Sequence, residues 1–387
     1  MNKVKTWVDE HLKGDPVIWA VVFALSIISI LVVYSATGTL AFKRMSNPET
    51  YLFKHTVLVG VGLLAMWFAH KVDYRYYSKI SRFALWVSVP LLIYTFTNGV
   101  SLNDASRWIN IPVINASFQP SDLASLALIT SLASMLSKRQ QNIADFKESL
   151  IPILIWCGVI CGLIALTNLS SAILLFLTCM LIMFIGRVPM KYLGMLVFVG
   201  LLSGVVALKF GVRGETAKNR IENFIQGKEL PFQAKHARIA VATGGVVGKG
   251  PGQSQQRNIL PHPYSDFVYA IIIEEYGMLG GVIVLILYLI LLSRGMKAVY
   301  NSERAFGGLL SAGLSFAIVI QAMVNMGVVV GLGPITGLPL PLISMGGTSL
   351  LFTGLSIGII ISVSRGEFDQ SWGTQGSKEI KNMAKAA

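Results

Sequence analysis

The sequence has little charge for its length. Only 13% of its 387 residues are Asp, Glu, Lys or Arg, whereas a soluble globular domain carries about 25%. Together with a mean hydropathy of +0.64, this deficit excludes an ordinary soluble domain and indicates that lipid is the solvent for most of the chain. The net charge of +13 would suggest a nucleic-acid partner in a soluble protein. In a membrane protein the positions of Lys and Arg matter more than their sum, and we expect no nucleic-acid partner.

Cysteine is also scarce, and a cleavable signal is lacking. The three cysteines, Cys157, Cys161 and Cys179, fall inside apolar runs, so we interpret them as small core residues rather than as a disulfide or a metal site. The polar, acid-containing start of the chain is followed by an apolar stretch without a small-residue cleavage site, which argues against a removable signal peptide. We find no repeat of 20–50 residues, so nothing in the sequence indicates a separate soluble domain.

Long apolar runs recur along the whole chain. A membrane-spanning helix needs about twenty mainly apolar residues, and ten runs approach that length: 17–37, 54–70, 81–98, 121–137, 150–167, 171–186, 192–210, 266–293, 307–330 and 346–364. We therefore predict an all-α polytopic membrane protein with about ten transmembrane helices. The membrane domain covers residues 17–365, between an N-terminal segment (1–16) and a tail (366–387).

Basic residues orient these helices. Short loops rich in Lys and Arg stay in the cytoplasm, and basic residues fill the alternate segments 71–82, 137–149, 187–191 and 294–304. This pattern predicts a multi-pass protein of the cytoplasmic membrane with both termini in the cytoplasm. The basic segment 210–265 between helices seven and eight is the exception. It is expected outside as a large extracytoplasmic loop, because long segments translocate largely regardless of charge.

Two explanations fit a basic outer loop. It could be a solvated loop held near anionic lipid headgroups, or it could bind a phosphate-bearing substrate at the outer membrane surface. Its glycine-rich part, residues 243–250, is not a nucleotide site, because a Walker A loop needs Gly at the place of Thr243 and Ser or Thr at that of Gly250. Backbone N–H groups and the ammonium of Lys249 could still approach a pyrophosphate there. A tight turn is the equal alternative.

Acidic residues mark the start of the eighth predicted helix. A proline-containing stretch delivers Asp266 to its first turn, where either helix capping or a general base for a sugar hydroxyl would explain a carboxylate. Glu274 and Glu275 follow about two turns deeper. Each carboxylate costs at least about 2.5 kcal/mol to insert into lipid, so both must face the bundle. We favour a structural role over a place in the site.

Further candidates lie in two other outer segments. Before the fourth helix, Ser121 and Asp122 have the pattern of a helix start, whereas Arg107 could either snorkel beside Trp108 or bind a lipid phosphate. The segment 331–349 joins the last two helices and is rich in Gly and Pro among apolar residues. Such a non-helical, re-entrant-like segment is tolerated at membrane depth only where protein or a cavity covers it, and loops of this kind often line a site.

Taken in order, these motifs resemble the SEDS family (shape, elongation, division and sporulation), the FtsW/RodA/SpoVE-type membrane proteins of the bacterial cell wall. The resemblance covers about residues 16–365. Its specific parts are the segments 106–109, 119–124, 244–250, 260–267, 274–277, 325–327 and 339–349. Each motif alone is weak, but seven in the right order are a strong match.

The resemblance implies a peptidoglycan glycosyltransferase that polymerises lipid II at the outer face of the cytoplasmic membrane. Asp266 matches the acid taken as catalytic, and it would deprotonate the 4-hydroxyl of the acceptor N-acetylglucosamine. That oxygen would attack the anomeric carbon of lipid-linked N-acetylmuramic acid with inversion, releasing undecaprenyl pyrophosphate. Cations, and a divalent metal (Mg²⁺ or Mn²⁺) as a further candidate, would stabilise the pyrophosphate charge. The expected substrate-binding residues are Arg107, Gln119, Ser121, Arg238, Lys249, Ser344, Thr348 and Ser349.

Three positions depart from the family pattern. Asn168 stands where many members have the Asp of a Gln-Pro-Asp run, Ser125 replaces a Lys, and His262 replaces a Glu. Any role of those residues in lipid II contacts is altered here.

Within the family, the segment 336–349 is closer to the division-type members of the FtsW kind. This implies work at the division septum with a class B penicillin-binding protein, other divisome proteins and membrane lipids as partners. Alternatives are an elongation-type, RodA-like polymerase, a lipid II flippase and a non-catalytic scaffold. A flippase would need polar groups through the membrane midplane, whereas the candidates here concentrate at the outer face.

Overall fold

The computed structural model describes residues 12–365 apart from residues 44–47, 99, 103–104, 112–115, 144, 211–213, 227–229, 262 and 303. Within this part of the chain, each of the ten predicted apolar runs coincides with a helix. They are α2 (Pro16–Lys43), α3 (Pro48–Lys71), α4 (Tyr74–Asn98), α5 (Pro120–Lys138), α6 (Ile151–Thr167), α7 (Leu169–Ile185), α8 (Met190–Phe210), α11 (Val268–Asn301), α12 (Ala305–Val330) and the C-terminal helix Thr348–Arg365.

The helices differ in how well they suit lipid. Seven are long and apolar enough to cross a membrane, α6 being counted with the π-helical turn Phe146–Leu150 before it, and α7 and Met190–Val205 of α8 are shorter apolar helices. Helix α5 is more polar because protein surrounds it: it contacts α4, α6, α7 and α12, and 12 of its 19 residues are buried. A polar helix can therefore cross the bundle without facing lipid.

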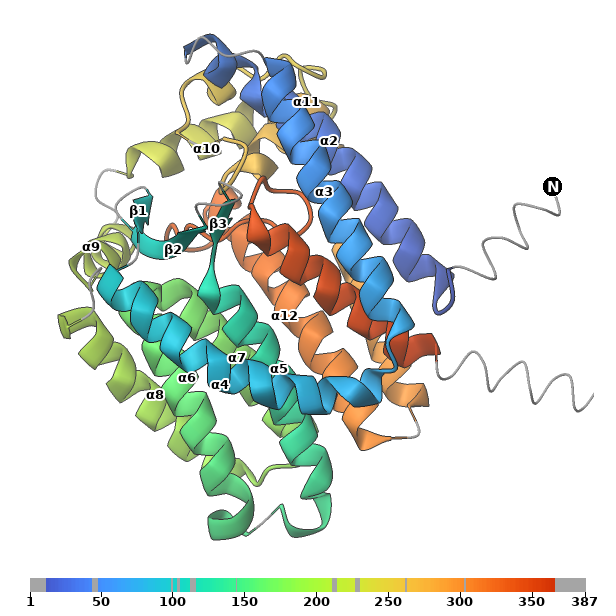
Figure 1. The fold of residues 1–387 in the computed structure, drawn as a ribbon. Coiled ribbons are helices and arrows are strands. Elements are labelled where there is room, and N and C mark those ends of the chain that lie inside the picture. Colours follow the sequence, from blue (N-terminus) through green and yellow to red (C-terminus); the bar gives the residue numbers. More distant parts are fainter. Residues whose placement is uncertain are drawn as a thin grey trace, which may run out of the picture.

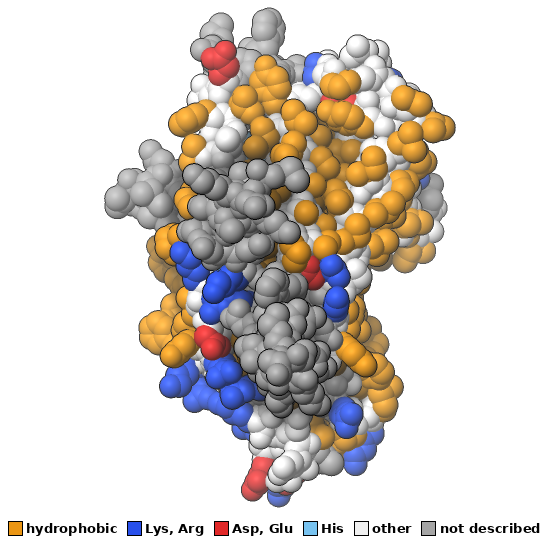
Figure 2. Space-filling view, turned by 90° about the vertical axis from the view of Figure 1, so that its right-hand side faces the viewer, with side chains coloured by type: hydrophobic (Ala, Val, Ile, Leu, Met, Phe, Trp, Pro, Cys, Tyr) orange, Lys and Arg blue, Asp and Glu red, His pale blue; other side chains and the backbone are white. Residues whose placement is uncertain are grey.

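Helix α12 lies in the middle of the bundle, between α2, α3 and α11 on one side and α4 to α8 on the other (Figure 1). The surface carries a broad hydrophobic area, with Lys and Arg gathered in the lower part of the face shown in Figure 2. Large apolar side chains of α3 such as Phe53 and Phe68 are more than half exposed. A lipid-facing belt accounts for both observations. Cys157 and Cys179 are buried, as expected for core residues, and Cys161 is half-buried.

Close packing of small residues joins α3 to the C-terminal helix. A Cβ atom added at Gly354 would lie 2.1 Å from the carbonyl oxygen of Gly62, and one at Gly358 would lie 2.4 Å from that of Met66. Only glycine fits at such distances, as in many membrane helix pairs.

The outer segment between α4 and α5 is not helical, so the all-α prediction misses it. It forms a three-stranded antiparallel sheet of β1 (Val100–Leu102), β2 (Ala105–Ile111) and β3 (Ala116–Phe118), in the order β1-β2-β3. The register pairs Ile109 with Phe118. Pairing satisfies backbone groups that a loop against the bundle could not otherwise satisfy.

The predicted large loop 210–265 is largely structured. It contains α9 (Gly214–Ile225), α10 (Phe232–Gly244) and the 3₁₀ turn Gln256–Asn258. Helix α10 packs on α11 and α12. The sheet, α9 and α10 lie at the same end of the bundle (Figure 1), and this end carries the candidate site.

Candidate functional site

Asp266 lies in the turn just before α11 rather than in the first turn of the helix. Helix α11 begins at Val268, and its N-cap residue, Phe267, makes no side-chain capping bond. Among the described residues, the half-buried carboxylate of Asp266 accepts one hydrogen bond, from Ser265 Oγ to Oδ1 at 3.0 Å. Capping therefore does not explain this acid, and most of its lone pairs remain available.

The backbone on either side of Asp266 is fixed from two directions. Asn325 of α12 donates from Nδ2 to the Asp266 carbonyl oxygen at 2.9 Å. Ser344 Oγ donates to the Ser265 carbonyl oxygen at 2.6 Å, and the Met345 N–H donates to that of Tyr264 at 2.9 Å. The carboxylate is thus carried on a rigid backbone, a condition for placing a reacting group accurately.

The Gly/Pro-rich segment after α12 is non-helical, as expected, and side chains of α12 cover its carbonyl groups. Asn325 Nδ2 donates to the Leu338 carbonyl oxygen at 2.7 Å, and Gln321 Nε2 donates to that of Pro339 at 2.9 Å. The segment passes directly beside the acid, because a Cβ atom added at Gly337 would lie 3.6 Å from Asp266 Oδ2. Gly337 also has a φ of 66°, which favours glycine.

Ser344 was expected to bind substrate, but the structure gives its hydroxyl another use. The residue is 2% exposed. Besides donating to Ser265, its Oγ accepts the Leu340 N–H at 2.7 Å. Ser344 therefore positions the Asp266 segment and presents no free hydroxyl to a ligand.

A polar cluster joins the start of α5 to the C-terminal helix. The Gln119 N–H donates to Thr348 Oγ1 at 3.2 Å, and Gln119 Nε2 donates to Ser121 Oγ at 2.8 Å and to Asp122 Oδ1 at 3.1 Å. Gln119, not Ser121 or Asp122, is the N-cap residue, and it makes no side-chain capping bond. The predicted helix start is confirmed, because α5 begins at Pro120 with Asp122 in its first turn, but neither Ser121 nor Asp122 caps the helix. Asp122 Oδ2 is buried without a hydrogen-bond partner in the described structure.

Fewer contacts are described for the other candidates in the outer segments. Ser349 is half-buried at the start of the C-terminal helix, where its N–H donates to the Gly346 carbonyl oxygen at 3.0 Å. Arg107 belongs to β2, but its side chain lies outside the described ones, as does His262 entirely. Ser125, which replaces a lysine of the family pattern, donates to the Ser121 carbonyl oxygen of its own helix at 2.7 Å.

The glycine-rich loop is neither a phosphate cradle nor a simple turn, because it inserts into a break in α11. The break is at Gly277, which has φ 70° and ψ −174°. The N–H groups of Lys249 and Gly250 donate to the carbonyl oxygens of Glu274 and Glu275 at 3.0 and 2.9 Å. In return, loop carbonyls accept the N–H groups of residues 278 and 279 at 2.9 and 3.2 Å. The N–H groups of Gly248, Lys249 and Gly250 are therefore already used, and none of these three points to a ligand.

Glycine is required on both sides of this insertion. A Cβ atom at Gly248 would lie 2.3 Å from the Glu275 carbonyl oxygen, and one at Gly277 would lie 2.2 Å from that of Val246. Two motifs that are far apart in the sequence thus form one unit.

Lys249 does not present a free cation to a phosphate, contrary to expectation. Its Nζ lies 2.6 Å from Glu274 Oε1 and donates to Thr243 Oγ1 at 3.0 Å. Glu274 is fully buried and also accepts the N–H groups of Gln255 and Gln256 at 3.1 and 3.2 Å. Its carboxylate neutralises the lysine and ties the loop to α11.

Glu275 is also buried, so both acids face the interior as predicted. Its carboxylate accepts a hydrogen bond from Ser35 of α2 and the Ser254 N–H at 3.4 Å, and Arg257 Nη1 lies 3.9 Å away. Arg257 Nη1 also donates to the Ser35 carbonyl oxygen at 3.0 Å. These contacts explain Glu275 as a structural residue, because they join the loop to α2.

Two arginines of the long loop lie against the segment that follows α12. Arg238 of α10 is half-buried, and its Nη2 lies 3.5 Å from the Gly331 carbonyl oxygen. Arg220 of α9 donates from Nη1 to the Ile335 carbonyl oxygen at 3.1 Å. Arg238 forms no ion pair within the part of the chain that the structure describes.

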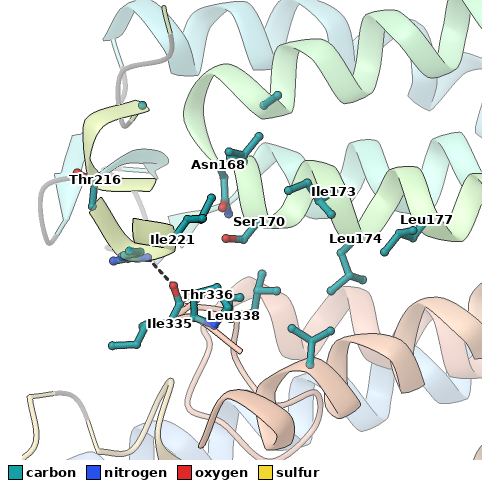
Figure 3. Close-up of a pocket in the computed structure, with 16 residues that line it drawn as sticks. Asn168, Ser170, Ile173, Leu174, Leu177, Thr216, Ile221, Ile335, Thr336 and Leu338 are labelled. Carbon is teal, nitrogen blue, oxygen red and sulfur yellow. Dashed lines mark hydrogen bonds between the residues drawn. The ribbon is translucent and has the colours of Figure 1, made fainter. Parts of the chain in front are cut away.

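A mainly apolar groove of about 190 Å³ opens beside this segment (Figure 3). Helices α6, α7, α9 and α12 line it together with residues 334–338. Thr336 and Leu338, which flank Gly337, line the groove, whereas Asp266 is not one of its lining residues. Sequence reasoning missed α9 and Arg220 as part of this site, although the spacing of three and four residues between apolar positions 217, 221, 224 and 225 is the signal of an amphipathic helix.

Asn168 has a structural role at the edge of this groove. It is the N-cap residue of α7, and its Oδ1 accepts the Ser171 N–H at 3.4 Å. It is 5% exposed and lines the groove. Helix capping is sufficient to explain this residue where family members carry an acid.

Comparison with known proteins finds relatives over nearly the whole chain. The family model of FtsW, RodA and SpoVE, described as "Cell cycle protein", matches residues 15–368. The chain is 32% identical to stage V sporulation protein E of Bacillus subtilis, over 91% of this chain and 98% of the other. It is also 32% identical to the probable peptidoglycan glycosyltransferase FtsW of Geobacter metallireducens, over 90% and 94%.

Solved structures show the same fold. A chain in a peptidoglycan synthase complex that coordinates polymerization and crosslinking is 25% identical, with a TM-score of 0.72 over 92% of this chain and 98% of that one. The rod shape determining protein RodA of Thermus thermophilus is 24% identical, with a TM-score of 0.66 over the same shares.

Proposed function

This chain belongs to the family of FtsW, RodA and SpoVE, and we propose that it is a peptidoglycan glycosyltransferase that polymerises lipid II. The observation that carries the proposal is Asp266, a half-buried carboxylate on a fixed backbone, next to the segment whose residues Thr336 and Leu338 line an apolar groove. A lipid-linked sugar needs both an apolar surface and a reacting group near it. The segment around Gly337 lies near both, since Gly337 is beside Asp266 and its neighbours Thr336 and Leu338 line the groove.

Asp266 acts as the general base in this proposal. It takes the proton of the 4-hydroxyl of the acceptor N-acetylglucosamine, and the oxygen forms a bond to the anomeric carbon of N-acetylmuramic acid. The bond from that carbon to the pyrophosphate oxygen breaks with its electron pair, so the configuration inverts. Base catalysis of this kind contributes about 10²- to 10⁴-fold to the rate. Because Ser265 is the one described donor to the carboxylate, Asp266 keeps the lone pairs that this step needs.

Positive charge for the departing pyrophosphate comes from the arginines rather than from Lys249. Arg238 and Arg220 both reach the 331–335 segment next to the groove, whereas Lys249 is neutralised by Glu274. An arginine binds phosphate oxygens through two parallel N–H groups, which makes Arg238 the candidate that we favour. Arg107 of β2 remains a second candidate.

A divalent cation, Mg²⁺ or Mn²⁺, would add to this charge when bound. The described residues contain no cluster of three His, Cys, Asp or Glu that could hold a metal. A single carboxylate such as Asp266 still fits Mg²⁺, which is usually bound by one or two carboxylates together with substrate phosphates and water. Gln119, Thr348 and Ser349, which carry amide or hydroxyl groups, are candidate hydrogen-bonding contacts for the sugars.

The setting that we propose is the outer face of the cytoplasmic membrane at the division septum. The positive-inside pattern of the short loops supports cytoplasmic termini. A class B penicillin-binding protein, with other divisome proteins, is the proposed partner, because a similar chain occurs in a peptidoglycan synthase complex.

The test is an assay of the purified protein with its partner on fluorescent lipid II, with products separated by length. We expect glycan chains longer than the disaccharide unit. A protein that moves lipid II between the leaflets of liposomes, but makes no polymer under any of these conditions, would instead be a transporter and would overturn the proposal.

A further inference from the structure

The turn formed by residues 340–344 (the 340–344 turn) contains a strained residue next to the site. Leu342 has a φ of 64°, in the left-handed region that costs a residue with a Cβ atom roughly 1–2 kcal/mol. Such strain persists only where the surroundings over-determine the backbone, and it is concentrated at functional sites. The contacts that hold this turn therefore bear on function.

One of these contacts comes from a buried histidine and serine in the first two helices of the bundle. Ser29 of α2 donates from Oγ to the Ile343 carbonyl oxygen at 2.8 Å, and its Oγ lies 2.8 Å from His55 Nε2 of α3. The serine has one proton, which the carbonyl receives, so the ring must donate from Nε2 to Ser29. In the neutral ring, the proton is therefore on Nε2.

This pair connects α2 and α3 to the 340–344 turn and does more than fill the core. Both side chains are fully buried, and His55 Nδ1 has no hydrogen-bond partner in the described structure. An imidazole is costly to bury with one nitrogen unsatisfied. A pair that served only to join α2 to α3 would end within those helices, whereas this one ends on the carbonyl next to the strained residue.

The 340–344 turn is in turn bonded to the segment that carries Asp266. Ser344 lies next to Ile343 and is bonded to the Leu340 N–H and to the Ser265 carbonyl oxygen. Ser265 in turn donates to Asp266 Oδ1. From His55 to the carboxylate, each step is one hydrogen bond or one residue of backbone.

We infer that His55 and Ser29 are positioning residues, which hold the 340–344 turn and through it orient the Asp266 carboxylate. This inference rests on the proposed polymerase function. Neither residue contacts the reacting atoms, so their loss should affect the rate of the chemical step more than substrate binding.

The experiment measures kcat and KM for lipid II with the complex of this protein and its partner. The variants are Ser29→Ala, His55→Leu, the double variant, and His55→Gln, whose amide can donate from about the position of Nε2. Ser88→Ala is the matched control, because Ser88 is also fully buried but donates only to the Ala84 carbonyl oxygen of its own helix. Asp266→Asn supplies the inactive reference.

We expect Ser29→Ala and His55→Leu each to lower kcat roughly tenfold with little change in KM. The double variant should lose no more than either single one, because the two residues act in series. His55→Gln should recover most of the rate, and Ser88→Ala should match the wild type.

The inference is wrong if Ser29→Ala retains the kcat of Ser88→Ala, or if His55→Gln falls as far as His55→Leu. Should His55→Leu fail to fold, Ser29→Ala decides, because it removes a single oxygen atom. A wild-type complex that makes no polymer would overturn the proposed function instead, so the two failures are distinguishable.

Discussion

Replacing Glu274 by Gln should strongly destabilise the protein. The carboxylate is fully buried, its ion pair with Lys249 is 2.6 Å long, and the lysine side chain is 25% exposed. Removing one partner of a buried ion pair costs about 3–5 kcal/mol, because the other charge loses its compensation. Water reaches part of Lys249, so we take the lower end of this range and expect a loss of about 3 kcal/mol in the free energy of unfolding.

The assay is reversible unfolding in mixed detergent micelles, with Glu222→Gln as the matched control. Glu222 pairs with Lys218 at 3.6 Å on the surface of α9, where both side chains are about half exposed, so its replacement should cost less than about 0.5 kcal/mol. Adding Lys249→Met to Glu274→Gln should recover part of the loss, because no uncompensated charge then remains. Equal stabilities of Glu274→Gln and Glu222→Gln would refute the reasoning.

Three further predictions concern glycine and amide positions. Gly354→Ala should cost about 1–3 kcal/mol, measured by the same unfolding assay, because its Cβ would lie 2.1 Å from the Gly62 carbonyl oxygen; a variant of unchanged stability would contradict this helix packing. Gly337→Ala should lower kcat, because the added methyl group would lie 3.6 Å from Asp266 Oδ2, with a stability loss of only about 1 kcal/mol. Unchanged kcat and KM would show that substrate does not bind next to Gly337. Asn325→Leu should lower kcat by about tenfold or more, because it removes the donor to the Asp266 carbonyl oxygen; wild-type polymerisation rates would show that this bond does not position the acid.

The helices could be predicted from the sequence because the composition of each apolar run is enough to indicate a helix in lipid. All ten predicted runs form helices, including α5, whose polar residues are tolerated because protein covers them. The sheet of β1 to β3 was missed, because short strands that pair locally carry no hydrophobic periodicity long enough to detect.

Prediction of the site was limited by contacts between distant residues. From its position between a proline-containing loop and an apolar helix, Asp266 could be predicted either as a helix cap or as a base, and the resemblance to the family favoured the base. The ion pair that neutralises Lys249 could not be predicted from the sequence. Its partner Glu274 is 25 residues away in the sequence, and the two meet only because α11 breaks at Gly277. Likewise, the family resemblance predicted that Ser344 binds substrate, and only the fold shows that its oxygen is used by the backbone of Leu340 and Ser265.

The roles of the substrate-binding candidates, the metal and the septal partner remain predictions. The family and the fold are established by the comparisons. The groove beside α9 is the feature that the structure adds, since its lining comes from four separate helices and one loop.

The central claim, that Asp266 is the base of a glycosyl transfer, is tested most directly by the rate of glycan polymerisation by Asp266→Asn. Asparagine keeps the size and the possible contact with Ser265 but cannot accept the proton. With wild-type folding and partner binding as controls, the account predicts a fall of about 10²-fold or more in the rate of the first glycosidic bond, with lipid II still bound. An Asp266→Asn complex that polymerises lipid II at the wild-type rate would contradict it.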